Sequence, residues 1–219
     1  ADGRVAVEGF YDGVRETTER DRADFAAVPF DETAFWRTIG AHGIWGEANR
    51  SVLEKIWLRP TLEINGLWGG YQGEGSKTVL PCEAHVKITC RLVAGQDPAK
   101  VAAAVEKHLR AHCPTLATLE IKSTGGGAGA YEIATDHPAL AAIEGVLEGV
   151  YGVKPFRSRL GGTLPLCAQF KSELGLDTIP MAFSTGDEDY HAPNEFFRVA
   201  SFDRGLTAWA RVFPALARI

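Results

Sequence analysis

The sequence lacks the features that mark several large classes of protein. Its four cysteines, Cys82, Cys90, Cys113 and Cys167, form no Cys-x-x-Cys pair and no regular framework. We therefore expect reduced structural thiols in a cytoplasmic protein, with Cys82 and Cys90 in phase on one buried strand face. No apolar run approaches the roughly 18 to 20 residues that a membrane span needs, and no signal peptide opens the chain. Internal repeats and low-complexity segments are also absent from the sequence.

An excess of basic charge is missing as well. The chain has 28 acidic and 23 basic residues, a net charge of −5. This balance argues against nucleic acid as a partner, because neutralising phosphates calls for a basic surface. Its 219 residues, 45% hydrophobic and 23% charged, suffice for one large soluble domain or two modest ones. The first residue is Ala1 rather than Met, which suggests a fragment or a processed chain.

Residues 1–55 are rich in charged and aromatic side chains, and they predict helices joined by loops. Asp31 stands directly before a short run of helix-forming residues, where its carboxylate can accept hydrogen bonds from the first free N–H groups of a helix. The charged run from Arg15 to Asp24 predicts a solvated helix face rather than a binding patch.

The following segment predicts an antiparallel sheet with a helix. Apolar and polar residues alternate over 61–65 and over 82–92, and this period of two indicates strands with one buried and one wet face. Five glycines predict a flexible loop at 66–76. An Asp-Pro start and an apolar stripe predict a helix over 98–111, and another strand is expected at 119–121. Together these elements form an α+β layer.

Beyond the glycines at 125–129, a candidate hinge, helices and short apolar strands alternate. An apolar stripe starting at a proline predicts a helix over 138–151, with Gly152 at its C-terminal end. Further helices are expected at 164–174 and 195–213, and a strand at 178–183. This alternation is typical of an α/β layer.

The loop from Ser184 to Glu195 holds the most informative group of side chains. It places Asp187, Glu188, Asp189 and His191 directly after a predicted apolar strand, where α/β proteins commonly carry their sites. A neutral imidazole binds zinc well, and nearby carboxylates can fix its tautomer. An ordinary surface histidine remains the more frequent explanation of such a loop taken alone.

Three weaker patterns could also bind a ligand. Arg91 lies on the wet face of the long predicted strand, where its guanidinium could clamp a carboxylate, although exposed arginines more often make ordinary surface pairs. The Gly161-Gly162-Thr163 turn offers N–H groups and a hydroxyl to an anion, which is a common arrangement. His108 and His112 have a metal-compatible i, i+4 spacing, but no glutamate follows His108, so a solvated helix face is expected.

The order and spacing of several short motifs resemble one known family. Arg59–Leu62, Gly75–Pro81 and Arg91–Val93 resemble the lid domain of the carnosine dipeptidase, aminoacylase and glutamate carboxypeptidase family of metallopeptidases. Motifs similar to the following stretches of that family's catalytic domain are Asp136–Leu140, Gly152–Pro155, Arg159–Pro165 and His191–Glu195. The resemblance runs from about Val5 to the C-terminus and is strongest to the dipeptidase branch, which carries a long helical insertion where residues 1–55 stand.

This resemblance implies a fold of two parts. An antiparallel sheet with helices would form a lid that dimerises, followed by the C-terminal part of an α/β catalytic domain. The lid or dimerisation domain, with its N-terminal helical insertion, would span 1–128, and the catalytic-domain segment would span 129–219. The α+β and α/β layers expected from the residue patterns agree with this division.

The resemblance also assigns roles to individual residues. His191 would be a ligand to one of two divalent metal ions, zinc or alternatively manganese. Arg91 would hold the terminal carboxylate of a dipeptide or N-acyl amino acid across a homodimer formed through the lid. Thr78, Gly162 and Thr163 would contact the substrate backbone or carboxylate. No nucleic acid and no membrane is expected as a partner.

The chain departs from the family chiefly in what it lacks. The family's mechanism uses a His-x-Asp pair, a bridging aspartate, a Glu-Glu pair and a further carboxylate. None of the six histidines is followed two residues later by Asp, and neither Glu-Glu nor the lid's Asp-Leu-His-Ser-Gly stretch occurs. A bridged two-metal site requires several ligands. We therefore expect the parent protein to be a hydrolase and this chain alone to be inactive, with His191 metal-free or weakly occupied.

Two milder departures concern the turn: Leu160 stands where an acidic residue is common, and Thr163 where serine is usual. Two other interpretations stay open. The chain could be a non-catalytic dimerisation or interaction module. It could also be a small-molecule-binding α+β domain unrelated to the family, with Arg91 and Gly162 as an anion site.

Overall fold

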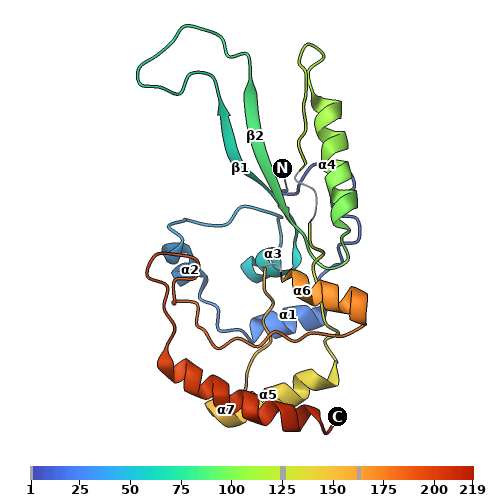
Figure 1. Ribbon diagram of the computed structural model, residues 1–219, viewed down its shortest axis with the longest axis vertical. Coiled ribbons are helices and arrows are strands. Elements are labelled where there is room, and N and C mark those ends of the chain that lie inside the picture. The colour runs from blue at the N-terminus through green and yellow to red at the C-terminus, as the bar shows by residue number, and fades with distance from the viewer. Residues whose placement is uncertain (1, 124–126, 162–163) are drawn as a thin grey trace. The chain divides into compact units, whose positions relative to one another are not determined.

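The computed structural model describes residues 2–123, 127–161 and 164–219 (Figure 1). In this part of the chain there are seven α-helices, one π-helical turn and one two-stranded antiparallel sheet. In chain order the elements are α1 (Glu19–Ala26), α2 (Glu32–Thr38), α3 (Val52–Leu58), β1 (Thr61–Gly69), β2 (Ala84–Arg91), α4 (Pro98–His112), α5 (Pro138–Tyr151), α6 (Pro165–Gln169), the π-helix η1 (Phe170–Leu174) and α7 (Val199–Leu216).

The chain divides into two compact units. The first comprises Ala1–Tyr131 and Arg159–Ala168, and the second comprises Glu132–Ser158 and Gln169–Ile219. The segment of residues 159–168, which the family resemblance places in the catalytic part, therefore belongs to the first unit. The expected hinge at 125–129 lies partly outside the described residues, and the functional boundary between 128 and 129 stays a prediction.

The short helices of the first unit begin at residues that cap their free N–H groups. Thr18 and Ser51 accept hydrogen bonds from the backbone N–H groups of Asp21 and Glu54, whose carboxylates in turn accept from the capping residues. Asp31 accepts from Ala34 N at 2.9 Å, which confirms its predicted role at the start of α2.

Asp21 does more than cap α1: the expectation of a solvated charged face is wrong at this residue, whereas Glu19, Arg20 and Arg22 are exposed as expected. The residue is 2% exposed. Its carboxylate accepts hydrogen bonds from Arg15 at 2.6 and 3.1 Å and from Arg159 at 2.7 Å. The Arg15 hydrogen bonds are the main cause that holds the pKa of the Asp21 carboxyl well below its usual range. Asp21 thus joins α1 to a segment that lies 138 residues further along the chain.

A second buried ion pair lies close to α3. Arg59 Nε donates to Glu47 Oε1 at 2.8 Å, and both side chains are buried. Phe25, Leu53 and Leu58 form a small apolar cluster in the same unit. Buried charges are tolerated where they are paired, so the charged residues of the N-terminal segment help to build the interior of this unit.

The hairpin of β1 and β2 packs against α4 along only part of its length (Figure 1). Leu62 and Cys90, opposite one another in the register, contact a cluster that contains Val101 of α4. Further along β1, a bulge at Asn65 lies between the pairs Ile64↔Ile88 and Gly66↔Lys87. The fully buried strand face expected over 82–92 is therefore wrong: β2 starts at Ala84, and Cys82 is exposed.

Several other predicted boundaries also change. β1 continues to Gly69, into the expected glycine loop. Neither 119–121 nor 178–183 forms a strand in the described part of the chain. The expected helix at 164–174 divides into α6 and the π-helical η1, and the closing helix α7 begins at Val199.

The second unit is built around the contact between α5 and α7. α5 ends at Gly152, whose φ of 72° is the left-handed conformation predicted for that position. Ser201, Gly205, Ala208 and Val212 form the buried face of α7. A Cβ atom at Gly205 would lie 3.0 Å from the Phe183 ring, so the glycine permits a close approach.

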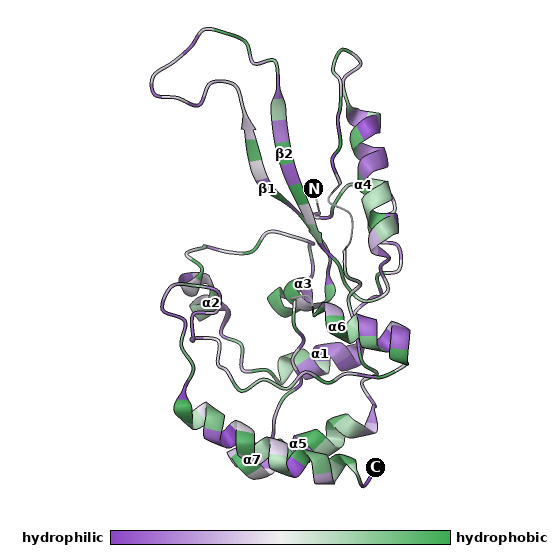
Figure 2. Cartoon of the chain, in the orientation of Figure 1, coloured by the Kyte–Doolittle hydropathy of each residue, from purple (hydrophilic) through white to green (hydrophobic). Residues whose placement is uncertain are grey.

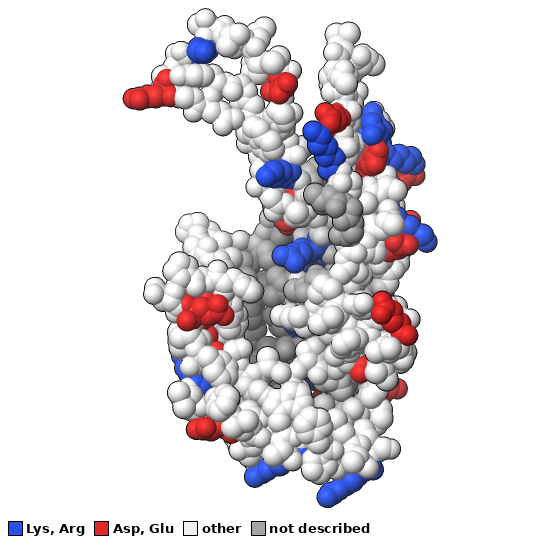
Figure 3. All heavy atoms as spheres, viewed as in Figure 1, with Lys and Arg blue, Asp and Glu red and all other residues white. Residues whose placement is uncertain are grey.

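Surface features agree with the composition. Among the described residues, no helix is both long enough and apolar enough to cross a membrane. All four cysteines are free thiols. On the face drawn in Figure 3, basic and acidic side chains are interspersed among the described residues.

Replacing Asp21 by Asn should destabilise the protein by about 3 kcal/mol, because it leaves the two arginines without their buried carboxylate. A depressed folded-state pKa contributes stability above the unfolded value of roughly 3.9, and this contribution is lost as the pH falls below it. Urea unfolding at several pH values should therefore show the gap between wild type and Asp21→Asn narrowing below about pH 4. The exposed Glu19→Gln is the control, and an equal loss in both variants would contradict the argument.

Candidate functional site

His191 lies in an exposed loop between Phe183 and α7. The backbone of this loop adopts left-handed conformations at Asp189, His191 and Asn194, with φ values of 53°, 60° and 68°. Non-glycine residues rarely take this conformation, and the surrounding structure has to hold it. Asp, His and Asn take this conformation more often than other non-glycine residues, so local preference and the anchors of the loop act together.

The first anchor is Glu188, which is 0% exposed. Its carboxylate accepts hydrogen bonds from Thr185 N at 3.0 Å, Arg198 N at 3.1 Å and an Arg198 guanidinium nitrogen at 3.2 Å. Thr185 and Arg198 lie at the two ends of the loop. A single buried carboxylate thus ties both ends together, with His191 between them.

The second anchor is the ion pair between Asp187 and Arg198. Two guanidinium nitrogens donate to the two carboxylate oxygens at 2.9 and 2.8 Å. The Thr185 hydroxyl also donates to Asp187, at 2.6 Å. This hydroxyl, followed by Arg198, lowers the pKa of the Asp187 carboxyl, and the hydrogen bonds to Asp187 raise the pKa of Arg198. The predicted role of these acids as partners of the His191 imidazole is not seen, because they bind Thr185 and Arg198.

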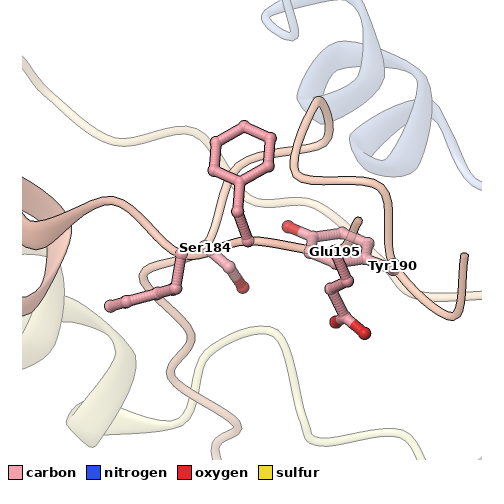
Figure 4. Close-up of a pocket in the computed structure, with 5 residues that line it drawn as sticks. Ser184, Tyr190 and Glu195 are labelled. Carbon is pink, nitrogen blue, oxygen red and sulfur yellow. The ribbon is translucent and has the colours of Figure 1, made fainter. Parts of the chain in front are cut away.

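A shallow pocket of about 450 Å³ lies in the same loop and is lined by Ser184, Tyr190, Glu195, Phe196 and Phe197 (Figure 4). The Tyr190 hydroxyl donates to Thr185 O at 2.6 Å. Two phenylalanines and one carboxylate make the lining mixed in character. The His191 imidazole is not part of this lining.

The ligand set that two metal ions would need is not present in the described part of the chain. No group of three or more His, Cys, Asp or Glu side chains lies close enough there to hold a metal ion. On α4, the His108 and His112 rings stack with centroids 4.0 Å apart, and His112 Nδ1 lies 2.8 Å from His108 O. His191 therefore stands as a single nitrogen donor.

The predicted substrate contacts Arg91 and Thr78 lie at opposite ends of β2. Arg91 is the last residue of the strand, is exposed and faces Thr61 in the register. Thr78 is exposed in the connection 70–83, beyond the other end of the hairpin (Figure 1). The eight-residue strand between them spans about 23 Å at roughly 3.3 Å per residue. A single dipeptide cannot touch both residues of one chain.

The other predicted contacts, Gly162 and Thr163, lie outside the described residues. The residues before them are held by two contacts within the first unit. Arg159 binds Asp21, and a Cβ atom at Gly161 would lie 2.5 Å from the carbonyl oxygen of Ile56. Only glycine fits at position 161, so the start of this turn is packed closely against α3.

Comparison with known proteins shows what this chain is similar to. Residues 12–117 match the model of the peptidase dimerisation domain. The Cys-Gly metallodipeptidase DUG1 of Saccharomyces cerevisiae is 26% identical over 95% of this chain and 44% of its own length. The Beta-Ala-His dipeptidase of Homo sapiens is 23% identical over 99% of this chain and 43% of its own length.

Solved structures agree with the sequence matches. An M20 family metallo-carboxypeptidase from Sulfolobus solfataricus matches with a TM-score of 0.79 and 26% identity, over 96% of this chain and 48% of that one. This chain is thus similar to M20 metallopeptidases over nearly its whole length. The structure of the dipeptidase Dug1p from S. cerevisiae has the same fold, with a TM-score of 0.78 at 22% identity over 100% of this chain and 46% of that one.

These matches confirm the family resemblance and the expected fold class, an antiparallel sheet with helices followed by part of a catalytic domain. The interpretation as an α+β domain unrelated to this family is wrong. The chain spans less than half the length of the curated proteins that it matches. The role of Glu188 and Arg198 as anchors of the His191 loop was not predicted from the sequence, because their spacing does not indicate that the two residues are in contact.

Replacing Glu188 by Gln should loosen the His191 loop. The amide would place an N–H donor against another donor, and an unsatisfied buried polar group costs about 1–3 kcal/mol. Hydrogen exchange at residues 185–198 should become faster and the melting temperature should fall. Asp189→Asn, in the same loop and exposed, is the matched control. Unchanged exchange in the Glu188 variant would show that the anchor is not needed.

Proposed function

We propose that this chain is the C-terminal part of a two-metal-dependent hydrolase that cleaves the amide bond of dipeptides or N-acyl amino acids. The observation that carries the proposal is the extent of the sequence matches. Named metallodipeptidases match 95% and 99% of the chain, through both the dimerisation domain and the His191 loop. Their names supply the substrate class proposed here.

Within this hydrolase, His191 would coordinate one metal ion through a neutral imidazole nitrogen. The Arg91 guanidinium would bind the terminal carboxylate of the substrate, with two N–H groups donating to two oxygens. The Thr78 hydroxyl and the Gly162-Thr163 turn would contact the substrate backbone or carboxylate. Arg91, Thr78, Gly162 and Thr163 would bind and orient the substrate, and metal ions held by the complete site would supply an activated water.

Two metal ions, zinc or manganese, do not fit the residues that this chain contributes. His191 offers one donor in an exposed loop, and neighbouring Asp187 and Glu188 are engaged by Thr185 and Arg198. The sequence contains no His-x-Asp and no Glu-Glu pair. We propose that the remaining ligands and the general base come from the rest of the hydrolase and that this chain alone is inactive.

A homodimer formed through the lid would allow one substrate to contact both Arg91 and Thr78. Arg91 and Thr78 are separated by the length of β2, so one substrate can contact both residues only if they come from different copies. The match to a peptidase dimerisation domain at 12–117 supports this arrangement. A cytoplasmic location is proposed on the four free thiols, which suit a reducing compartment.

A second candidate function is a non-catalytic dimerisation or interaction module. The observation that favours it is the missing set of metal ligands in this sequence. The two candidates differ in what lies upstream of Ala1 in the gene. A His-x-Asp and a Glu-Glu pair there would establish the hydrolase, whereas their absence would establish the module.

The first test uses this chain with added zinc or manganese and a dipeptide such as Cys-Gly. No hydrolysis above the buffer rate is expected, and the metal should leave the melting temperature unchanged, because specific binding would raise it by mass action. Turnover would contradict the proposed inactivity. Light scattering on the same sample should give a dimer, and a monomer at all concentrations would contradict the assembly.

The second test concerns Arg91 in the complete hydrolase. Arg91→Gln removes a charge-assisted hydrogen bond of about 1.5–3 kcal/mol, so KM for a dipeptide should rise roughly 10- to 100-fold. Lys87→Gln, on the same face of β2, is the control and should leave KM unchanged. A dipeptide with an amidated C-terminus lacks the carboxylate, so wild type and Arg91→Gln should hydrolyse it equally poorly. An unchanged KM in Arg91→Gln would remove Arg91 from the substrate site.

A further inference from the structure

Two histidines lie side by side in the C-terminal half of α4, where hydrophilic residues gather (Figure 2). His108 and His112 are four residues apart and therefore lie on the same side of the helix. Their rings stack with centroids 4.0 Å apart and an interplanar angle of 29°. His112 is exposed and His108 is half-buried. The two imidazoles thus form one pair of nitrogen donors that solvent can reach.

A hydrogen bond fixes the tautomer of His112. Its Nδ1 lies 2.8 Å from the backbone carbonyl oxygen of His108, an atom that can only accept. Nδ1 therefore carries the proton and donates, which leaves the lone pair of the neutral ring on Nε2. Metal-ligating histidines make the same kind of bond from their other ring nitrogen to a backbone carbonyl, because it orients the ring and raises the basicity of the ligand. His112 therefore already has the tautomer and the support of a metal ligand.

The surroundings of the two imidazoles permit an ion to bind. The charged side chains nearby on α4 pair with other residues: Arg110 donates to Glu106 at 2.7 Å and Lys107 to Glu8 at 3.3 Å. An ion at the histidine pair would therefore displace neither of these ion pairs. Two imidazole nitrogens that bind one ion at about 2.1 Å each lie roughly 3 Å apart. Rings that already stack need only tilt toward one another to reach this geometry.

We propose that His108 and His112 together bind one exchangeable divalent transition-metal ion of the nickel or copper class, with water in the remaining coordination positions. Imidazole suits these ions, and affinity among the divalent first-row metals rises through nickel to copper. Zinc is the less suitable ion, because structural zinc sites have four protein ligands and catalytic sites have three. The inference does not rest on the proposed hydrolase, since both donors lie in the described part of this chain.

The test is a nickel titration of this chain without a histidine tag, followed by calorimetry. Nickel is the probe because copper would also oxidise the free thiols. The wild-type chain should bind one nickel ion, and its melting temperature should rise with the nickel concentration, because an ion bound by the folded state stabilises that state by mass action. Zinc or manganese at the same concentration should leave the melting temperature unchanged.

Single substitutions separate the pair from the other histidines. His108→Gln and His112→Gln each remove one donor and should weaken nickel binding at least tenfold. His42→Gln, which removes an exposed histidine elsewhere in the first unit, is the matched control and should bind nickel as the wild type does. The melting temperature without nickel should stay close to wild type in all three variants, which separates the loss of a donor from a loss of folding.

The position of the ion is read from nuclear magnetic resonance spectra, because paramagnetic nickel broadens the signals of nearby residues. Broadening centred on His108 and His112 supports the proposal, whereas broadening centred on His191 overturns it. The proposal also fails if nickel binding does not saturate, or if both α4 variants bind nickel as tightly as the wild type. An equal rise of the melting temperature with zinc would overturn the choice of nickel and copper as the class of ion.

Discussion

The buried carboxylate of Asp21 is the contact on which the first unit depends. It joins the start of α1, through Arg15 and Thr18, to Arg159, the first residue of the segment 159–168, which belongs to the first unit although the sequences on either side of it belong to the second. A charge buried to this degree is stable only with its partners in place. The position of Arg159 is therefore set by the N-terminal helical segment, far away in sequence.

In the second unit, too, paired carboxylates hold a segment in place, here a single loop. Glu188 and Asp187 are held by Thr185 and Arg198, and the loop between them carries His191 in a left-handed conformation. Carboxylates that would be candidate ligands in a sequence motif serve instead as supports. Support of this kind is what a metal ligand needs, because a ligand contributes well only when its position is fixed before the ion binds.

Local signals predicted local structure well. The caps at Asp31 and Asp97-Pro98 and the helix end at Gly152 were predicted from neighbouring residues, and these interactions involve only neighbouring residues. The errors concern contacts between distant residues. Asp21 looked solvated because Arg159 is remote in sequence, and the segments 119–121 and 178–183 have strand-like patterns but no strand forms there in the described part of the chain. For the candidate site, His191 and Arg91 stay predictions that rest on the family resemblance, whereas the anchors of the His191 loop were not predicted.

In the proposed homodimer, the separation of Arg91 and Thr78 by the length of β2 would have a genetic consequence. If each site takes its arginine from one copy and its threonine from the other, a mixed dimer of a Thr78-deficient copy and an Arg91-deficient copy carries both defects in one site and none in the other. Two alleles that are each inactive alone would then restore part of the activity when expressed together. Complementation between the two alleles would thus report that Arg91 and Thr78 of one copy belong to different sites.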